Sequence, residues 1–244
     1  MLSSILFYFL MGCIAFLYAA IGHGGATGYI AIMSLFGFLP EKIRPIALSL
    51  NIIAAGISFF LYQTVVRARY DLTLALLVGS IPMAFIGGQY TIAAPIYKYI
   101  LAIILCIPAY RFLFNLTNEN KEIRNPNLLI ALLVGMILGL ISGMIGIGGG
   151  VLLAPLLILF GWTTTKQASF ISALFIVLNS LAGLMGYLSK NHLMPDLDYI
   201  LFLVIIIGAS FGAYIGSQRM SVSWIKKTLA LVLIIAIFKL IFVS

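Results

Sequence analysis

Charged side chains are scarce in this chain of 244 residues, and acidic ones are the scarcest. Six Asp and Glu stand against fourteen Lys and Arg, and charged residues make up 8% of a sequence that is 63% hydrophobic. The mean hydropathy is +1.19, and a soluble domain does not combine so much apolar sequence with so few charges. The scarcity therefore excludes an ordinary soluble domain and predicts an all-α, polytopic transmembrane helical bundle.

Several other features are also missing. The two cysteines, Cys13 and Cys106, each lie in an apolar run without a C-x-x-C or a histidine spacing, so no metal site and no cofactor are predicted. The net charge of +8 comes without a basic cluster interleaved with aromatics, which argues against a nucleic-acid partner. No Lys or Arg precedes Lys42, so the apolar run 5–21 is expected to stay as the first span and not to be a cleaved signal peptide.

Glycine, in contrast, is concentrated in two clusters inside apolar sequence. Gly148, Gly149 and Gly150 form one cluster, and Gly24 with Gly25 forms the core of the other. Each glycine costs about 1 kcal/mol of helix stability relative to alanine. Unpaired backbone groups at membrane depth are tolerated only where protein buries them or where they line a wet cavity. We therefore expect two helix breaks that take part in binding.

The chain has the pattern of two copies of one unit. The predicted segments are 5–21, 26–39, 43–65, 71–90 and 95–114, then 127–145, 150–162, 167–188, 198–218 and 222–243. Residues 79–89 align without gaps on 208–218, sharing glycine, alanine, isoleucine and glutamine in register. The predicted domains are a first transmembrane repeat (1–114), a polar linker (115–126) and a second transmembrane repeat (127–244), with the glycine-broken half helices at the repeat interface.

The topology depends on whether segments 26–39 and 150–162 span the membrane or are re-entrant, and the sequence leaves both open. Fourteen helical residues rise about 21 Å, less than a hydrocarbon core of about 30 Å. If these segments span, nine Lys and Arg face one side and five the other, whereas re-entrant segments give seven on each side. The positive-inside rule favours spanning segments, inverted repeats and cytoplasmic loops at Arg67 to Arg69 and Lys121 to Arg124, with Lys190 to His192 outside.

The second glycine cluster resembles the signature of the sulfite exporter TauE/SafE family of membrane permeases. The pattern G-x-G-G-G-x-x-x-x-P-x-L-x-x-x-G runs from Gly146 to Gly161. It continues through Ala168, Ser172, Asn179, Ser180, Gly183 and Tyr187. The resemblance implies a transporter of small sulfur-containing anions such as sulfite, sulfonates or thiosulfate-like species. The first copy departs from the pattern, with His23, Ala26 and Ala31 at the positions of Ile147, Gly150 and Pro155, so the two half-sites are not expected to be equivalent.

The physics of a broken helix also favours an anion. A helix that restarts after a break directs free N–H groups and the positive end of its dipole at the gap. The predicted site combines backbone with neutral polar side chains at Gly24, Gly25, Thr27, Asn51, Gln89, Gly148, Gly149, Gly150, Ser172, Asn179, Ser180 and Gln218. Each Ser, Thr or Asn has an alternative role, because it could simply form an interhelical bond or a bond to the i−4 carbonyl.

Other glycines are predicted to serve packing. They recur at every fourth residue on one helix face, at Gly135, Gly139 and Gly143 and at Gly208, Gly212 and Gly216. Gly212→Val is accordingly expected to impair assembly. Gly149→Val is instead expected to abolish binding, because the side chain would fill the space that the anion needs and valine resists a positive φ.

The candidate for proton coupling is His23, because the membrane interior is expected to hold no Asp, Glu, Lys or Arg. The alternative for His23 is a neutral ring bonded to backbone freed by the break. The predicted function is a secondary transporter of the cytoplasmic (inner) membrane that moves a small anion by alternating access. Its partners would be that anion and the lipid bilayer, and a homodimer is compatible with the sequence.

Two other functions compete with transport as readings of the sequence. A passive anion channel would share the polar centre but needs a continuous pore. An intramembrane serine hydrolase is suggested by G-x-S-x-G around Ser210, yet neither His23 nor His192 is placed on a helix with it to act as a base. A non-enzymatic function is therefore predicted.

Overall fold

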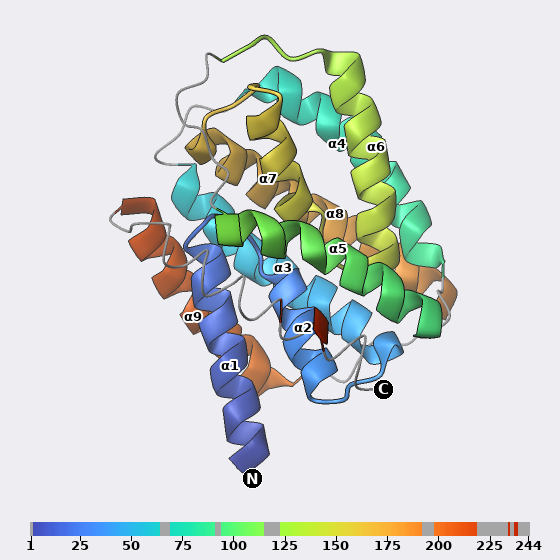
Figure 1. Ribbon diagram of the computed structural model, residues 1–244, viewed down its shortest axis with the longest axis vertical. Coiled ribbons are helices and arrows are strands. Elements are labelled where there is room, and N and C mark those ends of the chain that lie inside the picture. Colours follow the sequence, from blue (N-terminus) through green and yellow to red (C-terminus); the bar gives the residue numbers. More distant parts are fainter. Residues whose placement is uncertain are drawn as a thin grey trace.

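The computed structural model describes residues 2–63, 69–90, 94–114, 123–191 and 198–218, together with 234, 237 and 238. This part of the chain is all-helical (Figure 1), with the order α1 (Leu2–Ala19), α2 (Ala26–Leu35), α3 (Pro40–Tyr62), α4 (Tyr70–Gln89), α5 (Ala94–Phe114), α6 (Leu128–Ile145), α7 (Gly150–Leu159), α8 (Thr165–Asn191) and α9 (Tyr199–Gln218). Five helices, α3, α4, α6, α8 and α9, are long and apolar enough to cross a membrane. The predicted all-α transmembrane bundle is confirmed.

Some predicted segments fall where the structure gives no description. The last predicted segment, 222–243, and most of the linker 115–126 lie outside the described residues. Elsewhere the helix lengths follow one order in both halves, with 18 residues in α1 and α6, ten in α2 and α7, and twenty in α4 and α9. A duplicated unit would give this order, and the duplication itself stays a prediction.

The two short helices, α2 and α7, end in the same way. Gly37 and Gly161 follow them with φ of +79° and +69°. The N–H of Phe38 donates to Met33 O, and that of Trp162 to Leu157 O, each at 3.0 Å. Both ends are therefore Schellman motifs, in which glycine adopts the left-handed conformation at little cost. Ten residues rise about 15 Å, so neither helix is long enough to cross the membrane alone.

Each short helix runs back along the helix before it. The Phe7 ring, near the start of α1, lies 5.2 Å from that of Phe36 at the end of α2. A Cβ on Gly28, near the start of α2, would lie 2.5 Å from Ile14 Cγ2 in the second half of α1. In the other half, Arg124 N donates to Gly161 O over 2.7 Å, which brings the end of α7 back to the start of α6.

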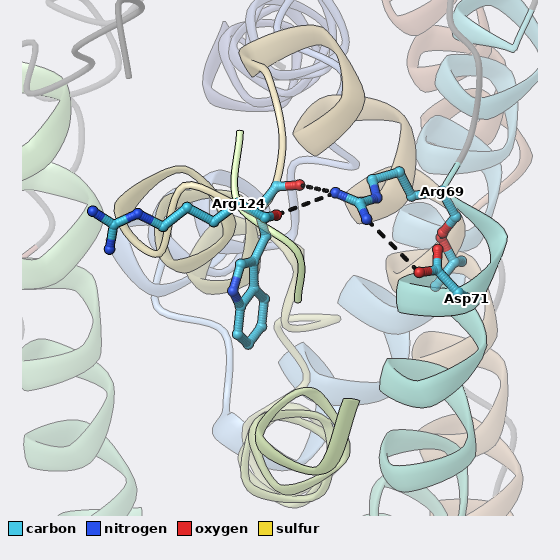
Figure 2. Close-up of polar contacts among 5 residues, drawn as sticks. Arg69, Asp71 and Arg124 are labelled. Carbon is cyan, nitrogen blue, oxygen red and sulfur yellow. Dashed lines mark hydrogen bonds and ion pairs between the residues drawn. The ribbon is translucent and has the colours of Figure 1, made fainter. Parts of the chain in front are cut away.

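The contacts define two ends of the bundle. At one end Arg69, before α4, donates to the carbonyls of Arg124 and Trp162 and lies 3.8 Å from Asp71 (Figure 2). We call this the Arg69 end and the opposite one the Arg44 end, where Arg44 contacts the last residues of α4. Because α6 starts at the Arg69 end and α1 at the Arg44 end, the two halves enter the bundle from opposite ends.

This arrangement bears on the open question of topology. Helix α2 runs back along α1, and α7 runs back along α6. Each short helix therefore leads the chain toward the end of the bundle at which its half of the sequence began. Both readings place Arg69 and Arg124 opposite Arg44, so these charges do not decide between them. The start of α1 lies at the Arg44 end, beside Phe36, as it would if segment 26–39 crosses. Many of the counted charges, among them Arg67, Lys121 and Arg219, lie outside the described residues.

Three helix pairs pack backbone against backbone, and one of them is α4 with α8, where a Cβ on Gly186 would lie 2.0 Å from Phe85 O. Glycines of α6 face α4, where a Cβ on Gly143 would lie 2.1 Å from Ala84 O. Glycines of α9 face α1, where a Cβ on Gly212 would lie 2.1 Å from Phe16 O. Gly135, Gly139, Gly208 and Gly216 have similar distances, from 2.0 to 2.5 Å, to carbonyl oxygens of the facing helix. The prediction that these glycines serve helix packing is confirmed, and each pair joins helices from different halves (Figure 1).

Candidate functional site

Both helix breaks occur at the glycine clusters. Gly25 has φ of +100°, and Gly146, Gly148 and Gly149 have φ of +91°, +71° and +74°. These are left-handed conformations that residues with a Cβ adopt with strain. Gly25 and Gly149 are the N-caps of α2 and α7, and neither helix has a side-chain cap at that residue. The sequence therefore predicted both breaks correctly.

One side chain, Asn51 of α3, lies between the two breaks. A Cβ on Gly24 would lie 2.0 Å from Asn51 Oδ1, and one on Gly148 would lie 2.1 Å from Asn51 Nδ2. Oδ1 accepts a hydrogen bond from Ala26 N at 3.2 Å, and Nδ2 donates to Ser180 Oγ at 3.0 Å. Four of the predicted residues, Gly24, Asn51, Gly148 and Ser180, thus meet at one point, where Asn51 is fully buried.

The two short helices begin at this point and run to opposite ends of the bundle. Their N-terminal ends, which carry the positive ends of the helix dipoles, consequently converge on Asn51. The ends differ in their bonding. The first N–H of α2 has Asn51 Oδ1 as acceptor, whereas within the described part of the chain the N–H groups of Gly149, Gly150 and Val151 make no hydrogen bond. At the α2 end the N–H groups of Gly25, Thr27 and Gly28 likewise make no hydrogen bond within the described residues, so the two ends offer equal numbers of free donors and differ in the side chain that caps the first N–H of α2.

The second break packs on one face of α8. A Cβ on Gly150 would lie 2.9 Å from Ser172 O, one on Gly149 would lie 2.8 Å from Phe175 Cε1, and one on Gly148 would lie 3.0 Å from Ile176 Cγ2. Together with Asn179 and Ser180, these α8 residues follow the spacing i, i+3, i+4, i+7 and i+8 of a single helix face. The predicted residues Ser172 and Asn179 therefore lie on the face that meets the break.

Three fully buried polar atoms on α6 and α8, the helices that contact this break, have no hydrogen-bond partner in the described residues. They are Ser142 Oγ, Ser172 Oγ and Asn179 Oδ1. A buried group without a partner costs about 1–3 kcal/mol. Ser142 comes from α6, and its Cβ would lie 3.3 Å from a Cβ on Gly149. Sequence reasoning missed Ser142, although it is the only polar residue of α6 and that isolation was a usable signal.

At the first break, two predicted residues make internal bonds. Thr27 Oγ1 donates to Tyr18 OH at 2.7 Å, which is the interhelical bond weighed as the alternative for such residues. His23 is buried, and its Nδ1 lies 2.9 Å from Ile21 O. A carbonyl oxygen only accepts, so Nδ1 carries hydrogen. The contact agrees with a histidine bonded to backbone freed by the break, and its role in proton coupling stays a prediction.

The two predicted glutamines lie at helix ends. Gln89 is the last residue of α4, and its Nε2 lies 3.4 Å from Ser189 Oγ near the end of α8. None of its contacts joins it to Asn51. Gln218 ends α9, and its side chain lies outside the described part.

Arg44, at one end of the bundle, is a buried charge that the predicted site does not include. The residue is 5% exposed within the apolar helix α3. Its guanidinium donates to the carbonyls of Gly87, Gly88 and Tyr90 and lies 5.3 Å from the centre of the Tyr187 ring. The last carbonyls of a helix lack intrahelical partners and form its negative end, so the end of α4 solvates this buried charge. The Arg44 side chain also contacts the second break, with Cγ 3.0 Å from the position of a Cβ on Gly146.

The environment of Gly149 changes the prediction for Gly149→Val. The space next to its Cα is occupied by Phe175 of α8, and the backbone φ is +74°. Valine would therefore strain the backbone and clash with Phe175 whether or not an anion binds. This substitution cannot separate binding from packing.

The described residues offer little for the other chemistries considered. No group of three or more His, Cys, Asp or Glu among them could hold a metal ion. The glycines on either side of Ser210, Gly208 and Gly212, pack against carbonyls of α1. Close helix packing thus accounts for the G-x-S-x-G pattern.

Comparisons with known proteins agree with the helical membrane architecture. The profile of the family described as "Sulfite exporter TauE/SafE" matches residues 7–240. A protein of Sinorhizobium fredii (strain NBRC 101917 / NGR234), named "Probable membrane transporter protein y4hK", is 31% identical over 231 residues, which cover 93% of this chain and 94% of that protein. No solved structure matches the chain significantly.

Proposed function

Because this chain belongs to the sulfite exporter TauE/SafE family, we propose that it carries a small anion, foremost a sulfur oxyanion or an organosulfonate, across the cytoplasmic membrane. The family and the relative's name make it a multi-pass membrane transporter. The anion, the direction and the mechanism belong to the proposal.

One observation carries the choice of an anion. The N-terminus of α7 presents the free N–H groups of Gly149, Gly150 and Val151 beside the unpartnered hydroxyls of Ser142 and Ser172. An oxyanion accepts several hydrogen bonds at once and is favoured at the positive end of a helix dipole. Broken helices at the midplane of transporters bind anionic groups in this way. We therefore place the anion at the start of α7, with α2 and Asn51 on the opposite side.

The arrangement also supports alternating access. The chain approaches the meeting point of the breaks from both ends of the bundle, and the two short helices leave it in opposite directions. A site at that point can be opened toward either end without being rebuilt. Arg44, beside Gly146, places a positive charge on the route from its own end, and this charge would attract anions.

The first experiment measures the thermal stability of the purified protein with a panel of anions. The panel holds sulfite, methanesulfonate, sulfate, acetate and chloride, with glycerol and choline as neutral and cationic controls at constant ionic strength. A ligand at about 100 times its Kd adds about 2.7 kcal/mol to the free energy of unfolding. We expect a sulfur oxyanion or sulfonate to raise the thermal stability of the protein most. A larger increase with glycerol or choline would contradict the proposal.

A second experiment separates a transporter from a passive anion channel. Proteoliposomes loaded with the unlabelled anion that stabilises best are diluted into a trace of the same anion in labelled form, with equal K⁺ on both sides and valinomycin to hold the membrane potential at zero. A transporter exchanges the two anions and concentrates the label transiently inside. A channel lets both anions run down their gradients, and label that never exceeds its outside concentration would favour the channel.

A further inference from the structure

Asn179 of α8 has a fixed orientation that leaves its carbonyl oxygen without a partner. Its Nδ2 donates to Phe175 O at 2.8 Å and to Ser80 Oγ at 2.9 Å. Phe175 O can only accept, so the atom facing it must be the amide nitrogen and the side chain cannot be flipped. Oδ1 is therefore the unpartnered atom, and the residue is fully buried.

This oxygen lies on the α8 face that meets the second break. Asn179 is one turn from Phe175, which contacts Gly149, and adjacent to Ser180, whose Oγ would lie 2.9 Å from a Cβ on Gly148. The same region holds the free N–H groups of Gly149 and Gly150. It thus offers several donors and one acceptor that needs a donor.

The charges of the region indicate how negative the ligand can be. Arg44 is the arginine that contacts this break, and three backbone carbonyls already share its guanidinium. The other groups beside the break are neutral amides and hydroxyls. The free energy of placing an ion in a medium of low dielectric constant grows with the square of its charge. A single negative charge suits such a site better than two.

From these observations we infer that the substrate is a monoanionic oxyanion that carries its own hydrogen-bond donor, which it gives to Asn179 Oδ1 while its oxygens accept from the start of α7. This inference rests on the proposed function and narrows its substrate class. Acid forms of oxyanions such as hydrogensulfite, and sulfonates with a hydroxyl group, belong to the class. Sulfate, the sulfite dianion, halides and simple alkanesulfonates do not.

The test uses two ligands of equal charge and nearly equal size. In 2-hydroxyethanesulfonate a hydroxyl group stands where propane-1-sulfonate has a methyl group, and neither titrates near neutral pH. Their Kd values are measured on the purified full-length protein by calorimetry or thermal shift. We expect the hydroxylated anion to bind about fivefold tighter or more. Equal affinities, or tighter binding of propane-1-sulfonate, would overturn the inference and leave the proposed function standing.

Two variants locate the effect. Asn179→Leu keeps the number and branching of the side-chain heavy atoms but has no carbonyl oxygen, and it should reduce the preference to about onefold while propane-1-sulfonate still binds. Ser80→Ala is the matched control, because it removes the hydroxyl that accepts from Asn179 Nδ2 and keeps Asn179 Oδ1. The Ser80→Ala protein should still prefer 2-hydroxyethanesulfonate. If the Asn179→Leu protein also keeps this preference, the role of Asn179 is refuted.

A third measurement covers the case in which 2-hydroxyethanesulfonate and propane-1-sulfonate are too large for the site. Sulfite is then titrated on either side of its second pKa, with methanesulfonate as a control for titration of the protein itself. Binding should weaken as hydrogensulfite is depleted, and binding that strengthens with the dianion would overturn the inference. If sulfite and all three sulfonates fail to bind, the proposed function fails as well.

Discussion

Asn51 Nδ2 of α3 donates a hydrogen bond to Ser180 Oγ of α8 across 3.0 Å, and this pair joins residues 129 positions apart. The same amide accepts from Ala26 N through its oxygen. One side chain therefore holds the start of α2 and the middle of α8 together at the meeting point of the two breaks.

Asn51→Leu should lower both stability and binding. The substitution leaves Ala26 N and Ser180 Oγ without their partner in a buried place, which we expect to cost about 1–3 kcal/mol of unfolding free energy. Asn51→Asp retains the acceptor for Ala26 N but adds a negative charge, so it should lose anion binding with a smaller loss of stability. Ser49→Ala is the control, because Ser49 Oγ bonds only Pro45 O within α3. Unchanged binding in Asn51→Asp would contradict an anion at this point.

Arg44→Leu should be strongly destabilising, by about 3 kcal/mol, because it removes charge-assisted bonds to the end of α4 and leaves buried carbonyls unsatisfied. The readout is the thermal unfolding of the purified protein. Lys42→Ala, an exposed position two residues away, should change the stability by less than about 0.5 kcal/mol. Similar losses in the two variants would show that the guanidinium bonds contribute little.

The Arg69 and Asp71 pair should contribute little by comparison. The two side chains are separated by 3.8 Å and are 22% and 52% exposed, so Asp71→Asn should cost no more than about 1 kcal/mol. The loss should shrink further at high salt, because the pair is open to screening. An effect as large as that of Arg44→Leu would mean that Asp71 has a role beyond this pair.

The orientation in the membrane can be checked by cysteine labelling in a background without Cys13 and Cys106. Cysteines at Ile123 and Tyr70, both exposed, belong to the Arg69 end. One at Tyr199, which is 84% exposed, belongs to the Arg44 end, because the preceding Asp198 accepts a hydrogen bond from Tyr8 OH near the start of α1. The positive-inside rule predicts that an impermeant thiol reagent reaches only Tyr199→Cys from outside. Labelling of Ile123→Cys together with Tyr199→Cys would contradict the arrangement.

Replacing His23 tests proton coupling. His23→Asn places an amide nitrogen near the position of Nδ1, which preserves the bond to Ile21 O but removes titration near neutral pH. If His23 carries the coupled proton, transport by this variant should lose its dependence on a pH gradient while the amount of folded protein stays the same. A wild-type response in proteoliposomes would leave His23 with a structural role.

The sequence predicted what depends on local backbone chemistry. Consecutive glycines such as Gly148 and Gly149 cannot propagate a helix, so the position of the break follows from composition alone. The packing of Gly212 follows from its period of four. These features need no knowledge of the distant partner.

Features that depend on how distant helices meet were not predictable in the same way. From the sequence, Arg44 is a loop charge near the start of a span. The end of α4, more than forty residues later, supplies the carbonyl acceptors that compensate for burying this charge. The unpartnered oxygen of Asn179 likewise depends on Ser80 of α4 occupying its nitrogen. Sequence symmetry with Gln218 predicts Gln89 in the site, yet the end of its helix lies away from Asn51.

The glycine contacts between helices also determine which parts of the bundle can move. A Cβ on Gly143 or Gly212 would lie 2.1 Å from a carbonyl of the facing helix, so α4 with α6, and α1 with α9, touch through their backbones and lack side chains that could rearrange. We expect helices packed in this way to move as rigid bodies. Each pair takes one helix from the first half of the chain and one from the second, so if the proposed alternating access holds, the bodies that shift should be these mixed groups of helices and not the two halves of the sequence.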